Sequence, residues 1–307
     1  MPTIDLTPTP TEAVATTPLD AAPRRVGLTL PELQHAAAAA GGAPLPFELA
    51  PPADTDGLED RLGRSRATTA DQAYRSAVAA LPDPEQSLAR RGLVVDDRLD
   101  PAVAGAVGLL ATPELALDVD VACGGVQAKT WHRAAAGAVA SLSTVDGIVF
   151  ELAWFPVAAW PEELARVAAV SEEVALGESA VPPLVDLPFE LVDAASEAIA
   201  NGRGDLVQVL AARHEGAVRG PDGPLAQAEA AQLLTALSGE AQGRLRAIVA
   251  EVGLMQAVGV VAWTLLADGW HALRPHRAAG EQRVEIRRVE PRDLAATLAP
   301  ALTEASR

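Results

Sequence analysis

The side chains able to perform chemistry are few and lie far apart in the sequence. The one cysteine, Cys123, ends an alternating run and shares its apolar side with Leu115 and Leu117. A thiol on the apolar side of a strand is usually a buried structural group, because a nucleophilic thiolate needs a cationic or basic neighbour. A single cysteine also excludes an intrachain disulfide, which is typical of proteins of the reducing cytoplasm. We therefore expect a cytoplasmic protein in which Cys123 has no catalytic role.

The five histidines do not form a metal-ligand pattern. His271 and His276 lie five residues apart, and on a strand this odd spacing points the two rings to opposite faces. His214 lacks the second histidine of a zinc-protease helix. We interpret these side chains and His132 as exposed or hydrogen-bonded groups. The sequence therefore predicts no bound metal.

Two short motifs also lack what their chemistry requires. The glycine-rich ACGGVQ is not followed by the Lys-Ser or Lys-Thr of a phosphate-binding P-loop. In NGRGD, Asp205 is best interpreted as the N-cap of the following helix. Nowhere do a nucleophile, a base and an orienting group come together. We therefore expect a protein that is not an enzyme, has no catalytic residues and needs no cofactor.

The charge composition argues against two classes of partner. The chain has a formal net charge of −17 at pH 7 and contains one lysine, Lys129. Phosphate-rich surfaces are bound by lysine and arginine, so nucleic acids and anionic membranes are not expected partners. The charge favours a basic or neutral protein partner, or serves only solubility. No run reaches the roughly 18 apolar residues that cross a bilayer.

The elements that would position these residues form an α+β pattern. Residues 115–123 alternate, with apolar residues on one side and aspartates on the other, which predicts a half-buried strand. The Asp-Gly pair at 146–147 predicts a hairpin turn between two further strands. One helix begins at Pro101 and a closing helix begins at Pro161. The first half is therefore predicted to be a helix, three or four antiparallel strands and a helix.

The second half repeats this order. Four strands are expected between residues 243 and 290, and a closing helix begins at Pro291. The two closing helices share the start Pro-x-acid-Leu-Ala, and LPFEL occurs at residues 45–49 and again at 187–191. We interpret both as traces of a duplication in which LPFEL marks the entry to each half.

The predicted fold is α+β, with two quasi-symmetric halves, each an antiparallel β-meander with flanking helices. Residues 1–25, rich in Thr, Pro and Ala, are expected to form a disordered tail. Residues 26–180 and 181–307 are expected to be the two halves of one globular unit. Residues 92–170 should superpose on residues 220–303 about an approximate two-fold axis.

One segment carries a resemblance to a known family. Gly92 is followed by apolar residues, an acidic turn at 96–97, the helix from Pro101, a break at 110–114 and the alternating strand. This pattern resembles the EspG family, the cytosolic chaperones associated with type VII secretion, and the likeness extends over residues 28–303. The resemblance implies the same α+β fold with two quasi-symmetric halves.

The resemblance also implies a function. Members of the EspG family bind the apolar helical tip of a PPE protein within a PE–PPE pair, keep it soluble and deliver the pair to the secretion machinery. We expect this chain to bind PE/PPE-like or WXG-type helical substrates in this way. Residues 123–137 leave little room for the long loop common in the family, so another small helical type VII protein is a further candidate partner.

The alternative class of function is a small-molecule-binding enzyme or sensor with a pocket between the two sheets. Such pockets carry a few polar groups that converge on the ligand. No convergent set of polar residues is evident in the sequence, which argues against this alternative.

The partner-binding residues are expected in the second sheet. Tryptophan is favoured at interface anchors, although core packing is the other interpretation for each of the five tryptophans. The second meander carries few charges, so we place an apolar groove there, beside the closing helix. Its candidate residues are Met255, Val261, Trp263 and Trp270.

Overall fold

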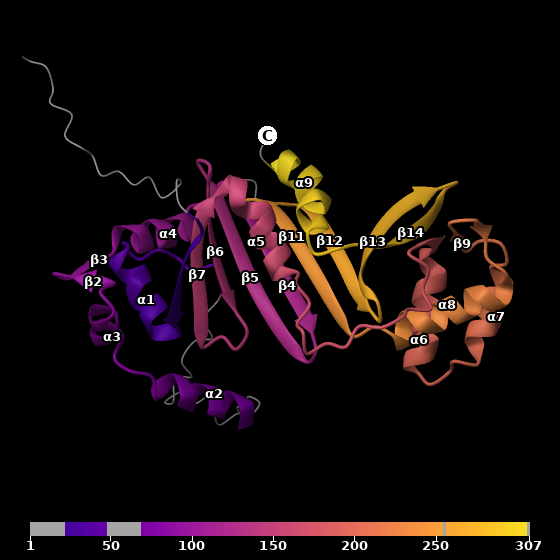
Figure 1. The fold of residues 1–307 in the computed structure, drawn as a ribbon, viewed down its shortest axis with the longest axis horizontal. Coiled ribbons are helices and arrows are strands. Elements are labelled where there is room, and N and C mark those ends of the chain that lie inside the picture. The colour runs from indigo at the N-terminus through magenta and orange to yellow at the C-terminus, as the bar shows by residue number, and fades with distance from the viewer. Residues whose placement is uncertain (1–21, 48–68, 254–255, 306–307) are drawn as a thin grey trace, which may run out of the picture.

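The structure is organised around one twelve-stranded antiparallel sheet (Figure 1). The computed structural model describes residues 22–47, 69–253 and 256–305. In sheet order, the strands are β1 (Arg24–Thr29), β7 (Val149–Pro156), β6 (Ala138–Thr144), β5 (Val126–Ala135), β4 (Leu115–Cys123), β11 (Gly243–Glu251), β12 (Gln256–Leu266), β13 (Gly269–Ala278), β14 (Glu281–Arg288), β8 (Leu184–Pro188), β9 (Arg219–Gly220) and β10 (Gly223–Pro224). A small second sheet pairs β2 (Val94–Val95) with β3 (Arg98–Leu99).

Helices precede and follow each run of strands, so the α+β fold class is confirmed. The helices are α1 (Leu30–Ala39), α2 (Thr69–Ala79), α3 (Pro84–Arg90), α4 (Pro101–Ala111), α5 (Trp160–Val167), α6 (Phe189–Ala200), α7 (Leu206–Arg213), α8 (Gln227–Gly239) and α9 (Asp293–Ala305).

The strand order is mirrored about the central pair β4–β11. Moving outward, one side runs β5, β6, β7, β1 and the other runs β12, β13, β14, β8. Each side is thus a four-stranded meander plus one earlier strand, with α4 or α8 before the meander and α5 or α9 after it. The superposition of residues 92–170 on 220–303, and the limits of the two halves at 180 and 181, stay predictions.

Local sequence explains where several elements begin. Asp100 caps α4, because its carboxylate accepts hydrogen bonds from the backbone N–H groups of Ala102 and Val103 at 2.9 and 3.0 Å. Thr29 and Glu32 form a capping box at the start of α1. Along β4, fully buried residues alternate with half-buried ones, as the sequence pattern predicted.

Several short strands were not expected from the sequence, and β1 and β8 are the longest of them. In β1, Arg24 and Arg25 pair with Trp154 and Ala153 of β7. The expectation of a disordered tail over residues 1–25 is therefore wrong for Arg24 and Arg25, which belong to β1. The first 21 residues of that tail lie outside the described part of the chain.

The two LPFEL copies do not occupy equivalent positions, so their interpretation as entry markers is wrong. In the second copy, Leu187 and Pro188 end β8 and Phe189 begins α6. In the first copy, residues 45–47 follow α1 in irregular structure, and its last two residues lie outside the described ranges. By topology, the partner of the β8–α6 connection is the β1–α1 connection, at Thr29.

The helices divide the hydrophobic core into three parts. Successive residues of one strand belong to different parts because their side chains point to opposite faces. On β7, Ala153 packs in the core under α5 and α9, whereas Leu152 packs in the core under α1 and α4. On β12, Leu265 belongs to the first of these cores and Leu266 to a third, under α6, α7 and α8.

This arrangement leaves part of one face of the sheet uncovered. Helices α5 and α9 lie over the central strands on one face (Figure 1). On the other face, α1 and α4 cover the strands near one end and α6 to α8 cover those near the other end. Between them, Ile248 of β11 and Val260 of β12 face outward and belong to none of the three cores of the described residues, whereas Trp131 of β5 lies at the edge of the core under α1 and α4.

Candidate functional site

The tryptophans expected to anchor a partner lie in the core. Trp263 and Trp270 are each 1% exposed, and their ring centroids are 6.2 Å apart. The Nε1 of Trp270 donates a hydrogen bond to the carbonyl oxygen of Ala168 at 2.8 Å. Neither indole is available at the surface, so for both the core alternative holds and the expected position in an open groove is wrong. The physical reason is that α9 covers this face.

Of the other two candidates, only Val261 lies in the described part of the chain, and it does not line an open groove. Val261 is half-buried and packs against the same core as Trp263. Met255 lies outside the described residues. The face beside the closing helix is thus filled with packed side chains, and a partner could reach it only if α9 moved away.

The close approach of α9 to the sheet depends on Gly259 of β12. A Cβ atom at this position would lie 2.5 Å from the Cβ of Ala301, which is less than any real contact between carbon atoms. Glycine is therefore required here for the helix to pack at its present distance.

We expect Gly259→Val to destabilise the protein by roughly 1–3 kcal/mol, because the new side chain must displace α9. The measurement is urea-induced unfolding followed by circular dichroism. The control is Gly27→Val, since Gly27 is also in a strand but has no atom within 4 Å of a Cβ placed on it. Equal midpoints for Gly259→Val and wild type would show that α9 is not held at this distance.

The uncovered face carries a distinct set of side chains, which we call the central strip. They are Lys129 and Trp131 on β5, Asp118 and Asp120 on β4, Arg244, Arg246 and Ile248 on β11, and Val260 on β12. Strand register places them in rows across the sheet. One row is Trp131, Asp118, Ile248 and Val260, and the next contains Lys129, Asp120 and Arg246.

The first row is mostly apolar. Val260 is 57% exposed, which is unusual for a valine in the middle of a long strand. Ile248 and Trp131 are partly exposed, and the Trp131 ring lies 5.2 Å from that of Phe47. Asp118 is the one charge in this row, and Arg133 donates to its Oδ1 at 2.6 Å. This end of the strip can therefore bury apolar surface of a partner.

The other end of the strip is basic. Lys129, Arg244 and Arg246 are exposed, and none of them forms an ion pair with another described residue. Asp120 lies between Lys129 and Arg246 in the register, but its two oxygens accept hydrogen bonds from the Gln127 amide, each at 2.9 Å. Beside this end is a hollow of about 570 Å³ lined by residues that include Gln127, Gly243 and Arg244.

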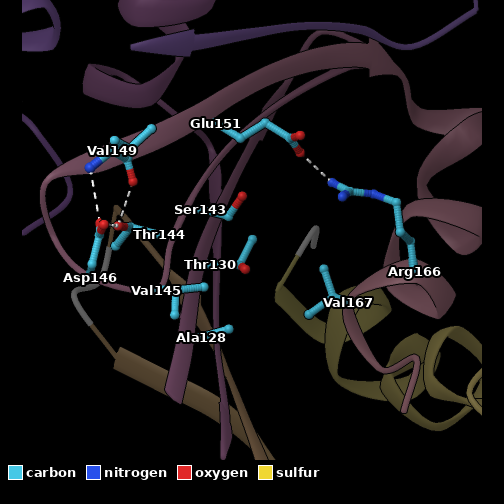
Figure 2. A pocket seen from close by; sticks show the side chains of 10 residues that line it. All are labelled: Ala128, Thr130, Ser143, Thr144, Val145, Asp146, Val149, Glu151, Arg166 and Val167. Atoms are coloured by element: carbon cyan, nitrogen blue, oxygen red, sulfur yellow. Dashed lines mark hydrogen bonds and ion pairs between the residues drawn. The ribbon is translucent and has the colours of Figure 1, made fainter. Parts of the chain in front are cut away.

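A second hollow, of about 430 Å³, lies on the opposite face near the β6–β7 turn (Figure 2). Arg166 and Glu151 in its lining are paired, with Arg166 Nη2 2.6 Å from Glu151 Oε1, and Arg166 Nε donates to Glu163 at 3.2 Å. Glu163 also pairs with Arg25 of β1. These contacts join α5 to the sheet.

The comparisons with known proteins address the fold. No family model and no curated protein matches this sequence. Among solved structures, the Mycobacterium tuberculosis type VII secretion system chaperone EspG5, in complex with a PE25–PPE41 dimer, matches 91% of this chain and 96% of its own, with a TM-score of 0.57 and 13% sequence identity. The chain has an EspG-like fold. This confirms the expected α+β, EspG-like fold class, although the two meanders form one continuous sheet and not two.

The EspG-like fold also bears on the alternative function. Because its two halves join edge to edge through β4 and β11, they form one sheet and enclose no space between facing sheets in the described ranges. No group of three His, Cys, Asp or Glu side chains suited to a metal occurs among the described residues. In the same ranges, no helix is long and apolar enough to cross a bilayer.

Two side chains with possible chemistry, His132 and Cys123, have pKa values shifted by burial. His132 is buried, and its Nδ1 accepts a hydrogen bond from Trp160 Nε1 at 3.2 Å. Burial, together with the nearby guanidinium groups of Arg133 and Arg166, lowers the pKa of His132 to about 3. The ring is therefore neutral, with its proton on Nε2. Burial also raises the pKa of the Cys123 thiol, which disfavours the thiolate.

Sequence reasoning missed the central strip, although a signal for it was present. Asp118 and Asp120 were placed on the polar side of their strand, and Arg244 and Arg246 alternate in the same way on β11. A polar side is usually taken as solvent-facing and uninformative. Only the pairing of β4 with β11 shows that these charges lie together on one surface.

Proposed function

We propose that this chain is a non-enzymatic cytosolic chaperone that binds the apolar helical tip of PE/PPE-like or other small helical type VII secretion substrates and delivers them to the secretion machinery. The observation that carries the proposal is the central strip, an uncovered sheet surface bordered by helices and carrying the exposed Val260. The EspG-like fold supports it, since EspG5 was solved with a PE25–PPE41 dimer.

The dimensions of the strip suit a helical occupant. Four adjacent strands about 4.8 Å apart span roughly 14 Å from the first to the last. An α-helix with its side chains is about 10 Å wide, so a helix end or a tight helical hairpin fits across the strip. The apolar row of Trp131, Ile248 and Val260 would cover the apolar tip, because burying such surface on both partners is favourable.

We expect Val260→Asp to weaken binding of such a substrate by roughly tenfold or more, since it places an unpaired charge in a desolvated contact. Binding is measured by calorimetry against the PE25–PPE41 dimer and then against further PE–PPE and WXG-type dimers until one binds. Circular dichroism and thermal melting check the fold of each variant.

The control is Val209→Asp, because Val209 is similarly exposed, at 48%, but lies on α7 away from the strip. If a dimer binds wild type and Val260→Asp equally well, the strip is not the binding surface. If no dimer binds wild type, the chaperone function itself is contradicted.

A further inference from the structure

The sign of the charge on the central strip is opposite to that of the protein. The chain as a whole has a net charge of −17, yet the strip presents three exposed cations that lack an ionic partner among the described residues. Of its two carboxylates, Asp118 forms an ion pair with Arg133, and Asp120 accepts hydrogen bonds from the side-chain amide of Gln127. A local cluster of unpaired cations on an acidic protein needs an explanation beyond solubility.

We infer that the basic end of the central strip, formed by Lys129, Arg244 and Arg246, binds carboxylates of the partner and selects substrates whose apolar helical tip is followed by acidic residues. This inference rests on the proposed function and adds to it the chemistry that distinguishes one helical substrate from another. The occupant is one kind of partner, an acidic helical tip.

The spacing of the rows fixes where those carboxylates must lie. Successive rows on one face are two residues apart, or about 7 Å. Arg246 is thus about 7 Å from the apolar row at Ile248, and Arg244 is about 14 Å from it. Along a helix that rises 1.5 Å per residue, these distances correspond to roughly one and two-and-a-half turns. The partner would present its acidic side chains at those distances from its apolar tip.

The local cations outweigh the overall negative charge in the bound complex. At physiological ionic strength the screening length is about 8 Å, so charges on the far parts of the protein contribute little to a contact at the strip. Lys129 and the two arginines lie within the contact itself. Guanidinium groups also bind carboxylates through two parallel hydrogen bonds, which adds directional selectivity.

Three variants test the inference at 150 mM NaCl, with the PE25–PPE41 dimer or the first PE–PPE or WXG-type dimer that binds as the probe. Arg244→Glu with Arg246→Glu should weaken binding at least tenfold, and the neutral Arg244→Gln with Arg246→Gln should have a smaller effect in the same direction. Asp120→Asn should strengthen binding about two- to fivefold, because it removes a negative charge from the strip. A purely structural role of Asp120 would not improve affinity.

The matched control is Arg213→Glu with Arg219→Glu, which makes the same change in net charge at two exposed arginines on α7 and β9. Unchanged affinity of the Arg244 and Arg246 variants, with Val260→Asp still defective, would overturn the inference and leave the chaperone proposal intact. Equal weakening by the control would also overturn it, since the effect would then come from net charge. If no dimer binds, both proposals fail.

Discussion

Replacing Trp263 with alanine should lower the free energy of unfolding by about 3–5 kcal/mol, the range observed when a large aromatic side chain is removed from a packed core. The residue is 1% exposed and lies against Trp270 in the core that α5 and α9 cover. The cavity would open between the sheet and helices α5 and α9, and the hydrogen-bonded strands limit how far the surroundings can close it. Urea unfolding at pH 7, followed by circular dichroism, measures the change.

Two further variants make this result specific. Val260→Ala, three residues away on the same strand but 57% exposed, should change stability by less than about 0.5 kcal/mol. Trp263→Phe should cost less than Trp263→Ala, because the Nε1 of Trp263 has no hydrogen-bond partner in the described structure and most of the volume is kept. A stable, fully folded Trp263→Ala variant would mean that this residue is not in the core and that α9 does not cover it.

The second large expected effect is a loss of folding stability at acid pH, caused by the buried His132. We expect His132 alone to reduce stability by about 3 kcal/mol when the pH falls from 7 to 4, because each pH unit is worth about 1.4 kcal/mol. Its pKa is lowered to about 3 in the folded protein from an ordinary value of 6.5. Between these values the unfolded chain binds a proton that the folded protein does not. The contribution is therefore fully present above pH 6.5 and is lost as the pH falls toward 3.

The test compares wild type with His132→Gln by urea unfolding at pH 7, 6, 5 and 4. The difference between the two proteins removes the contribution of the carboxylates, which is common to both. The free energy of unfolding of wild type, relative to that of His132→Gln, should fall steadily as the pH drops below 6.5. A His214→Gln control should follow wild type. If the free energies of unfolding of wild type and His132→Gln change in parallel with pH, burial does not lower the pKa of His132.

The fold could be predicted to the extent that its signals are local. β4 alternates over nine residues, and Asp100 caps α4 within the next three, so both followed from sequence. β1 and β8 were missed because each is short and offers only a few apolar positions to a pattern. The repeat of LPFEL was misleading, since in a sequence rich in leucine and proline a five-residue match carries little positional information.

The site could not be predicted because it depends on contacts between distant parts of the chain. The alternation of β12 correctly groups Val261, Trp263 and Leu265 on one side, but nothing local tells whether that side meets solvent or a helix. The answer comes from α9, more than 25 residues later in the sequence, which packs on it. In the same way, the strip combines charges of β4 and β11 that only strand pairing brings together.

The β4–β11 pair has a consequence for how the protein is made. Leu115 pairs with Glu251 and Cys123 with Gly243, so the paired residues are 136 and 120 positions apart in the chain. Contacts of such long range form late, because a large loop must close before they contribute. During synthesis, β4 is therefore made before its partner β11 and has one unpaired edge until β11 is available. An unpaired strand edge with an apolar side is prone to associate with other chains. The strand that becomes the centre of the sheet is thus exposed to such association until its later partner β11 pairs with it.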